Sequence, residues 1–161
     1  MMEKLLRRIY NSKKLSLTLK IISHASSLAA AAAFLVMLVE AFLVSRLSAL
    51  LLLLAAGIPF ILVSLARLII NAPRPYELYG FYERPPKNKS GRSFPSRHAF
   101  SAFVIGVLAY PFSPVLMIAL LLLGVAVSVS RVLLGMHFPR DVFAGCAIGV
   151  LSGVIGLLIM M

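Results

Sequence analysis

The segment ALLLLLAAGIPFILVSLARLII, residues 49–70, decides the fold of this chain. Only one of its 22 residues, Arg67, carries a charge. A helix needs about 20 mostly apolar residues to cross the hydrocarbon core of a bilayer. A backbone surrounded by lipid must also satisfy its own hydrogen bonds, which a helix does within a single segment. Residues 49–70 are therefore predicted to form a transmembrane helix.

Four further apolar segments have the length of membrane spans, namely residues 21–44, 96–112, 114–130 and 142–161. The whole chain of 161 residues is 61% hydrophobic and only 13% charged, with a mean hydropathy of +1.00. A chain this short has too much surface to hide so many apolar residues from water, and its composition also excludes disorder. We expect an all-α fold, an integral membrane helical bundle of about five transmembrane helices.

The first 20 residues have a different composition. Six Lys and Arg residues alternate there with leucine and isoleucine, which makes the segment too polar to span a bilayer. We predict a basic amphipathic N-terminal segment over residues 1–20, either lying on an anionic membrane surface or forming a solvated leader. Residues 21–161 are then expected to form a single membrane-embedded domain.

The chain carries 16 Lys and Arg residues against 5 Asp and Glu residues, a formal net charge of +11. In a soluble protein this excess would suggest nucleic acid as a partner. Here the basic residues must lie outside the lipid core, so we expect anionic headgroups or a phosphorylated ligand and no nucleic acid. The single cysteine, Cys146, excludes an intrachain disulfide.

Five alternating crossings bring the polar helix ends together on one side of the membrane. The residues gathered there share charge or hydrogen-bonding capacity, and they are Arg67, Arg74, Ser96, Arg97, His98, Arg131, His137 and Asp141. They include the only aspartate and two of the three histidines of the chain. A functional site is a better explanation for this cluster than a set of structural polar caps.

The cluster has the residue types that phosphoryl transfer needs. Guanidinium groups of Arg67, Arg74 and Arg131 match phosphate oxygens. Pro95 is expected just inside a helix start, where the free N–H groups of the next turn, around residues 96–98, would point at an anion, and Ser96 adds a hydroxyl donor.

The spacing of His137 and Asp141, four residues apart, allows the carboxylate to fix the imidazole as a nucleophile. His98 can then give a proton to the leaving oxygen and later activate water. A metal ion among at least three arginines is electrostatically disfavoured, so we expect neither a metal nor another cofactor.

Three short motifs in these segments resemble those of the type 2 phosphatidic acid phosphatase family. Residues 67–75, RLIINAPRP, resemble K-x6-R-P, and residues 95–98, PSRH, resemble P-S-G-H. Residues 130–141, SRVLLGMHFPRD, resemble S-R-x5-H-x3-D. The motifs occur in the family's order and at the expected helix ends, although Arg67 replaces the lysine and Arg97 replaces the glycine.

The resemblance implies a metal-independent phosphatase of lipid phosphates with a membrane lipid as substrate. It makes His137 the nucleophile that forms a phosphohistidine, Asp141 its orienting group and His98 the general acid. The phosphate would be held by Arg67, Arg74, Ser96, Arg131 and the backbone N–H of Arg97. Phosphatidic acid, phosphatidylglycerol phosphate and polyprenyl diphosphate are candidate substrates. Membrane members of the family typically have six spanning helices, one more than the sequence offers here.

Other functions fit the sequence less well. A catalytically silent lipid-phosphate-binding scaffold is the main alternative. A transporter or channel is disfavoured because the apolar segments hold few polar groups to line a path, and a vanadate-dependent peroxidase because the chain is short and membrane-embedded.

Orientation in the cell membrane and self-association are also open. With five spans, 15 of the 16 basic residues lie on the side of the site, which favours a cytoplasmic site for this multi-pass protein. The resemblance favours the outer face. Gly145, Gly149 and Gly153 recur every four residues, a spacing typical of close helix packing inside a bundle or, alternatively, in a homo-oligomer.

Overall fold

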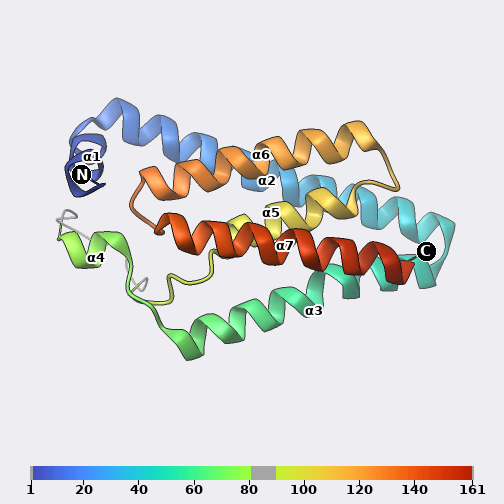
Figure 1. Cartoon of the computed structure of the whole chain (residues 1–161). Helices are drawn as coiled ribbons and strands as arrows, with labels where there is room; N and C mark the ends of the chain where they lie inside the picture. The colour runs from blue at the N-terminus through green and yellow to red at the C-terminus, as the bar shows by residue number, and fades with distance from the viewer. Residues whose placement is uncertain (1, 81–89, 161) are drawn as a thin grey trace.

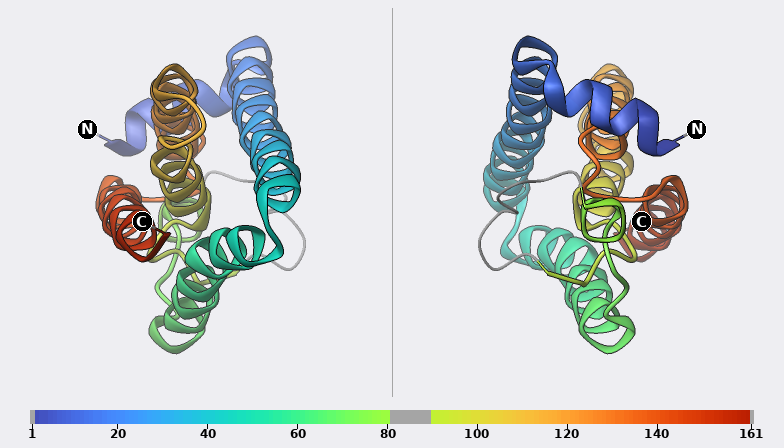
Figure 2. Two further views of the ribbon diagram at one scale, coloured as in Figure 1. Left: turned by 90° about the vertical axis from the view of Figure 1, so that its right-hand side faces the viewer. Right: turned by 90° about the vertical axis from the view of Figure 1, so that its left-hand side faces the viewer.

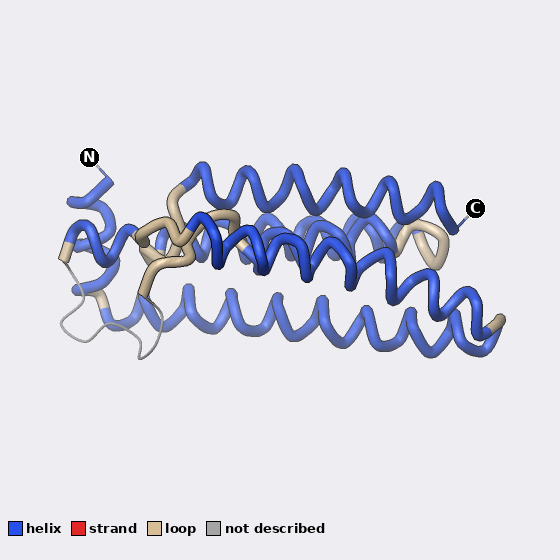
Figure 3. Tube along the Cα trace, turned by 90° about the horizontal axis from the view of Figure 1, so that it is seen from below, coloured by secondary structure: helices blue, strands red, loops and turns tan. Residues whose placement is uncertain are grey.

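The computed structural model describes residues 2–80 and 90–160, and all regular structure in them is helical. The predicted all-α membrane bundle is confirmed. Its elements are α1 (Met2–Asn11), α2 (Lys13–Val44), α3 (Arg46–Ile70), α4 (Pro75–Tyr79), α5 (Arg97–Leu108), α6 (Pro114–Leu133) and α7 (Pro139–Met160). The long helices run side by side, so that most loops lie at the two ends of the bundle (Figure 3).

Four helices, α2, α3, α6 and α7, are long and apolar enough to cross a membrane. The remaining predicted span, residues 96–112, corresponds to α5, which is shorter than expected. It has only 12 residues, and residues 109–112 form turns instead of continuing the helix. Pro111 explains the early end, since it lacks an N–H group and disfavours helical geometry in the residue before it. At about 1.5 Å per residue, α5 spans roughly 18 Å, and neighbouring helices bury most of it.

The N-terminal segment of residues 1–20 divides into two parts. α1 ends at Asn11, and α2 begins at Lys13, with the Ser12 hydroxyl accepting a hydrogen bond from Leu15 N. α1 crosses the end of the bundle at a steep angle to the long helices (Figure 2). Its residues Leu6 and Ile9 are buried in a small apolar cluster with Leu19, Tyr76, Leu134 and Met136. α1 therefore packs on the loops that lead into the polar helix ends.

The helix ends that carry the predicted site residues lie together at one end of the bundle, called here the polar end (Figure 1). The N-terminus, α4, the last turns of α3 and α6, and the first turns of α5 and α7 all lie there. The α2–α3 turn with Arg46, the α5–α6 turn and the C-terminus lie at the opposite end. The basic residues Arg84, Lys87 and Lys89, also expected at the polar end, lie outside the described residues.

The glycines of α7 are used inside the bundle. Gly145, Gly149 and Gly153 are buried, and a Cβ atom added to Gly149 would lie 2.6 Å from the backbone oxygen of Phe100 on α5. The helices α5 and α7 make the most extensive contact in the fold. Of the two uses that the glycine spacing suggests, packing inside the bundle is the one that these contacts support, because α5 of the same chain lies on the Gly145, Gly149 and Gly153 face.

We predict that Gly149→Ala destabilises the protein, because the added methyl group must push α5 and α7 apart. Overpacking of this kind costs about 1–3 kcal/mol. Gly57→Ala in α3 is the matched control, since nothing lies within 4 Å of a Cβ at that position. Alanine is also favoured over glycine in a helix by about 1 kcal/mol. Thermal unfolding in detergent should show a lower Tm for Gly149→Ala alone, and equal Tm values for both variants would contradict this packing.

Candidate active site

A pocket of about 340 Å³ lies at the polar end of the bundle. It combines residues from α3, α5 and α6 with residues of the loops before α4, α5 and α7. The described residues that line it are Ser64, Arg67, Leu68, Arg74, Ser90, Gly91, Arg92, Arg97, His98, Arg131, Met136 and His137. Six of the eight residues predicted for the site therefore line this single pocket, and Ser96 and Asp141 lie behind its wall.

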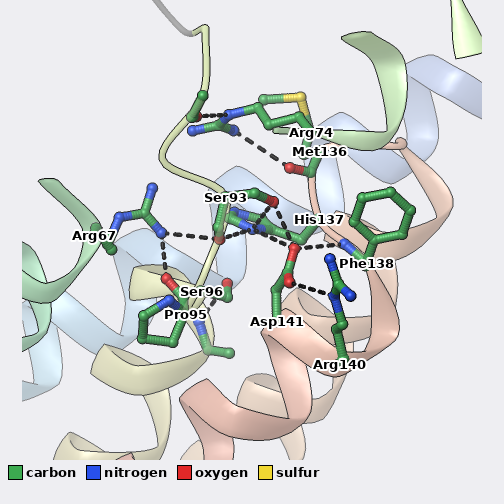
Figure 4. A network of polar contacts seen from close by, with 12 residues as sticks. Arg67, Arg74, Ser93, Pro95, Ser96, Met136, His137, Phe138, Arg140 and Asp141 are labelled. Carbon is green, nitrogen blue, oxygen red and sulfur yellow. Dashed lines mark hydrogen bonds and ion pairs between the residues drawn. The ribbon is translucent and has the colours of Figure 1, made fainter. Parts of the chain in front are cut away.

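Arg67 joins the end of α3 to the loop before α5. Its side chain is only 6% exposed, and its Nη1 donates hydrogen bonds to the carbonyl oxygens of Pro95 and, at 3.3 Å, Ser93 (Figure 4). The helix ends three residues later, at Ile70, because Asn71 adopts the left-handed conformation at the C-cap. The guanidinium is thus held by the backbone while it faces the pocket.

Arg74 is also buried and fixed by backbone groups. Its Nε donates to the Gly91 carbonyl oxygen at 2.9 Å, and its Nη1 donates to the Met136 carbonyl oxygen at 3.4 Å. Glu77 supports this arrangement, because its carboxylate accepts hydrogen bonds from the backbone N–H groups of Arg74 and Gly91. Gly91 has a φ of +62°, a conformation that favours glycine, and a Cβ there would overlap the Asn71 Oδ1 atom. The loop therefore requires glycine at this point.

The other two arginines of the predicted set have fewer backbone partners. Arg131, in the last turn of α6, is 8% exposed, and its Nε has no hydrogen-bond partner among the described residues. Arg97 begins α5, and its guanidinium carbon lies 5.9 Å from the centre of the Phe60 ring. The side chain of Arg97, which stands where the family motif has glycine, therefore adds positive charge to the pocket.

Ser96 serves as the N-cap of α5. Its buried hydroxyl accepts a hydrogen bond from Ala99 N, and its own backbone N–H donates to the Asp141 carbonyl oxygen at 2.8 Å. Ser96 thus connects α5 to α7, and the side chain expected to donate to phosphate does not line the pocket. His98, two residues further on, is exposed and does line it.

His137 and Asp141 approach each other without a direct hydrogen bond. The distance from His137 Nδ1 to Asp141 Oδ2 is 3.9 Å, whereas Nδ1 lies 2.8 Å from the Ser93 carbonyl oxygen. A carbonyl oxygen can only accept, so the imidazole carries a proton on Nδ1 and leaves Nε2 with a free lone pair. Asp141 Oδ2 instead accepts from the Ser93 hydroxyl at 2.5 Å and from Phe138 N at 2.9 Å.

The imidazole of His137 is neutral in this environment. Burial, together with the positive charges of Arg74 and Arg67, lowers its pKa to about 2, and the hydrogen bond to the Ser93 carbonyl offsets only part of this effect. The contact with Asp141 is therefore one between a neutral ring and a carboxylate. A neutral imidazole with an unprotonated Nε2 is the form that can act as a nucleophile.

The sequence assigned no role in the site to three residues that shape it, namely Ser93, Glu77 and Gly91. Glu77 had a signal, because it stands three residues after Arg74 at the start of a helix, the spacing of a capping box. Ser93 had none, since its role depends on a backbone carbonyl and on contacts with residues 26 and 48 positions away.

Known proteins share this architecture. The crystal structure of Aquifex aeolicus LpxE superposes with a TM-score of 0.71 and 26% identity, covering 96% of this chain and 93% of that one. The first transmembrane PAP2-type phosphatidylglycerolphosphate phosphatase from Bacillus subtilis superposes with a TM-score of 0.73 and 24% identity, covering 98% and 83%. The second match shows a common fold.

At the level of sequence, the chain matches one relative over a short segment and one family profile over most of its length. The Bacillus licheniformis bacitracin transport permease protein BcrC is 45% identical over 60 residues, which make up 37% of this chain and 30% of that protein. The match thus spans less than a third of that relative's length. The sequence profile of the PAP2 superfamily matches residues 48–161 and so includes every pocket residue described above, which means that the chain belongs to the PAP2 superfamily.

Proposed function

We propose that this protein is an integral membrane phosphatase that removes a phosphate, as a monoester or a diphosphate, from a membrane lipid. The observation that carries the proposal is that His98 and His137 line one pocket together with Arg67, Arg74, Arg97 and Arg131. Two imidazoles can serve as nucleophile and proton donor, and guanidinium groups stabilise the charge that develops on the phosphoryl oxygens. Membership of the PAP2 superfamily supports the same reaction.

The proposed reaction has two steps. In the first, His137 Nε2 attacks phosphorus, the bond from phosphorus to the lipid oxygen breaks, and His98 gives its proton to that oxygen. In the second, His98 takes a proton from water, which attacks the phosphohistidine and releases inorganic phosphate. Buried arginines around the pocket hold the equatorial oxygens in both steps. No metal ion is required, and a cation would be repelled by these arginines.

A second pocket gives a reason to place a lipid in the site. It has a volume of about 510 Å³, has a mostly apolar surface, and shares Arg97 and His98 with the phosphate pocket. Its lining comes from α2, α3 and α5, and includes Ala31, Phe34 and Phe60. We infer that the apolar tail of the substrate lies in this groove while the phosphate sits among the arginines. Phosphatidic acid, phosphatidylglycerol phosphate and polyprenyl diphosphate all have this division into tail and phosphate.

We expect His137→Ala to lower phosphate release by at least about a thousandfold, as the loss of a catalytic group does. The assay is phosphate release from a panel of lipid phosphates in detergent with a chelator present. His24→Ala, which removes an exposed histidine from α2, is the matched control and should retain full activity. Near-normal turnover by His137→Ala would refute the nucleophile, and strict dependence on a divalent ion would refute the metal-free reaction. A wild-type protein that binds lipid phosphates without turnover would be a scaffold.

We expect Ala31→Leu to narrow the apolar groove and raise the KM for a long-chain lipid phosphate about tenfold. A tenfold weaker affinity is what the lipid tail would lose if roughly two of its methylene groups were no longer buried in the groove. The turnover of a small water-soluble phosphomonoester should not change, because the phosphate pocket is untouched. Ala119→Leu, at an exposed position on α6, adds the same side chain outside the groove and is the matched control. Equal effects of Ala31→Leu on both substrates would contradict a tail in this groove.

We propose further that the site faces the cytoplasm. The exposed residues Lys4, Arg8, Lys13, Lys14 and Lys20 lie at the site's end of the bundle, and no phosphate chemistry requires them there. Positive charge of this kind marks the cytoplasmic side.

The orientation can be read from single cysteines in a Cys146→Ser background. With a membrane-impermeant maleimide, Tyr110→Cys, in the turn at the opposite end, should be labelled in intact cells. Asn11→Cys, at the site's end, should be labelled only after permeabilisation. The reverse pattern would place the site on the outer face.

A further inference from the structure

Ser93 holds a central position among the three motifs although it belongs to none of them. Its backbone N–H donates to the Ala72 carbonyl oxygen at 2.9 Å, and its carbonyl oxygen accepts from Arg67 and from His137 Nδ1. Its hydroxyl donates to Asp141. The residue is fully buried. Figure 4 shows the side chains of Arg67, His137 and Asp141 converging on Ser93.

Both polar groups of Ser93 lie near His137 Nδ1, the carbonyl oxygen at 2.8 Å and the hydroxyl oxygen at 3.4 Å, and the hydroxyl also reaches Asp141. The carbonyl oxygen is 2.8 Å from His137 Nδ1, close to the usual length of an N–H···O hydrogen bond. The hydroxyl oxygen is 2.5 Å from Asp141 Oδ2, a short bond of the kind that an O–H group makes to a charged acceptor. Asp141 Oδ2 itself lies 3.9 Å from Nδ1, too far for a direct hydrogen bond. Ser93 therefore provides the hydrogen-bonded connection between the carboxylate and the imidazole, because its hydroxyl lies between Asp141 Oδ2 and His137 Nδ1.

We propose that Ser93 is the positioning residue for the nucleophile. Its carbonyl oxygen fixes the proton of His137 on Nδ1, so that Nε2 faces the pocket, and its hydroxyl transmits the effect of Asp141. This role rests on the proposed phosphatase function. As Nε2 bonds to phosphorus, positive charge spreads over the ring and strengthens the hydrogen bond from Nδ1 to the carbonyl oxygen. The carboxylate of Asp141 keeps that carbonyl in place by holding the serine side chain.

The first test is a set of variants. Ser93→Ala removes the hydroxyl and keeps the carbonyl, and we expect kcat to fall about 10- to 100-fold, the range for losing one hydrogen bond to a charged group. KM should stay unchanged, because Ser93 does not line the pocket. Ser93→Cys retains a weak donor of similar size and should give an intermediate kcat. Ser128→Ala, which removes a buried hydroxyl next to Cys146, is the matched control with unchanged kcat.

The second test couples Ser93 to Asp141. If the carboxylate acts through the serine hydroxyl, the Ser93→Ala/Asp141→Asn double variant should lose no more activity than the more impaired single variant. If the carboxylate acts directly on the imidazole, Ser93→Ala should stay within about threefold of wild type while Asp141→Asn alone is impaired, and this result would overturn the proposal. Multiplicative losses in the double variant would also overturn it. Tm values in detergent identify any variant that has lost its fold.

The third test needs no variant and no substrate. Nitrogen-15 NMR of the wild-type protein should show His137 as a neutral imidazole with its proton on Nδ1 between pH 5 and pH 8. A proton on Nε2, or protonation of both nitrogens in this range, would refute the role of the Ser93 carbonyl. This result is independent of turnover. A chain with the proton on Nδ1 but without activity on any lipid phosphate would instead refute the proposed function.

Discussion

The hydrogen bonds from Arg67 to two backbone carbonyl oxygens hold the polar end of the bundle together. Loop carbonyls at a membrane boundary have no helical partner, and a buried guanidinium has no water, so each is costly unless paired. Here each satisfies the other, because Arg67 donates to Ser93 and Pro95. The loop is thereby fixed against α3. The start of α5 and the first turn of α7 are fixed in the same way, because Ser96 N at the start of α5 donates a hydrogen bond to the Asp141 carbonyl oxygen in α7.

This mode of pairing leaves the pocket strongly positive. Its described lining holds five arginines and no acidic residue. Arg67 and Arg74 donate hydrogen bonds to backbone carbonyl oxygens, which carry no net charge and so do not neutralise the guanidinium groups. Asp141, the one aspartate, is fully buried behind the wall and is turned towards Ser93 and Phe138 N. Repulsion among the arginines is relieved when an anion with more than one charge enters. A phosphoryl group meets this condition, and a neutral lipid does not.

The sequence predicts some features of this protein well because they depend on local composition. The long apolar segments predict α2, α3, α6 and α7, and alternating crossings predict that distant motif residues meet at one end. The early end of α5 is harder to predict, because residues 109–112 are apolar enough to continue a span, and only the local effect of Pro111 on the backbone stops the helix. The division of the N-terminal segment likewise depends on one cap, Ser12.

In the site, too, the sequence predicts which residues come together but not which atoms contact each other. The i, i+4 spacing of His137 and Asp141 places them near each other, as the motif implies, but spacing does not say which atom accepts the Nδ1 proton. That partner is the backbone of Ser93, 44 residues earlier in the chain. A backbone carbonyl is present at every residue, so its role leaves no mark in the sequence. Ser96 shows the converse, because its side chain caps α5 and does not line the pocket.

The same positive field serves both parts of the proposed chemistry. Burial and the charges of Arg74 and Arg67 keep His137 unprotonated, so that its lone pair is available at any physiological pH. A histidine in an ordinary setting, with a pKa near 6.5, would be partly protonated and partly inactive in acidic conditions. Once a phosphoryl group enters, its negative charge offsets the arginines, and the ring can accept the positive charge that bond formation brings. The positive charges that bind the phosphate thus also keep His137 unprotonated before the phosphate binds.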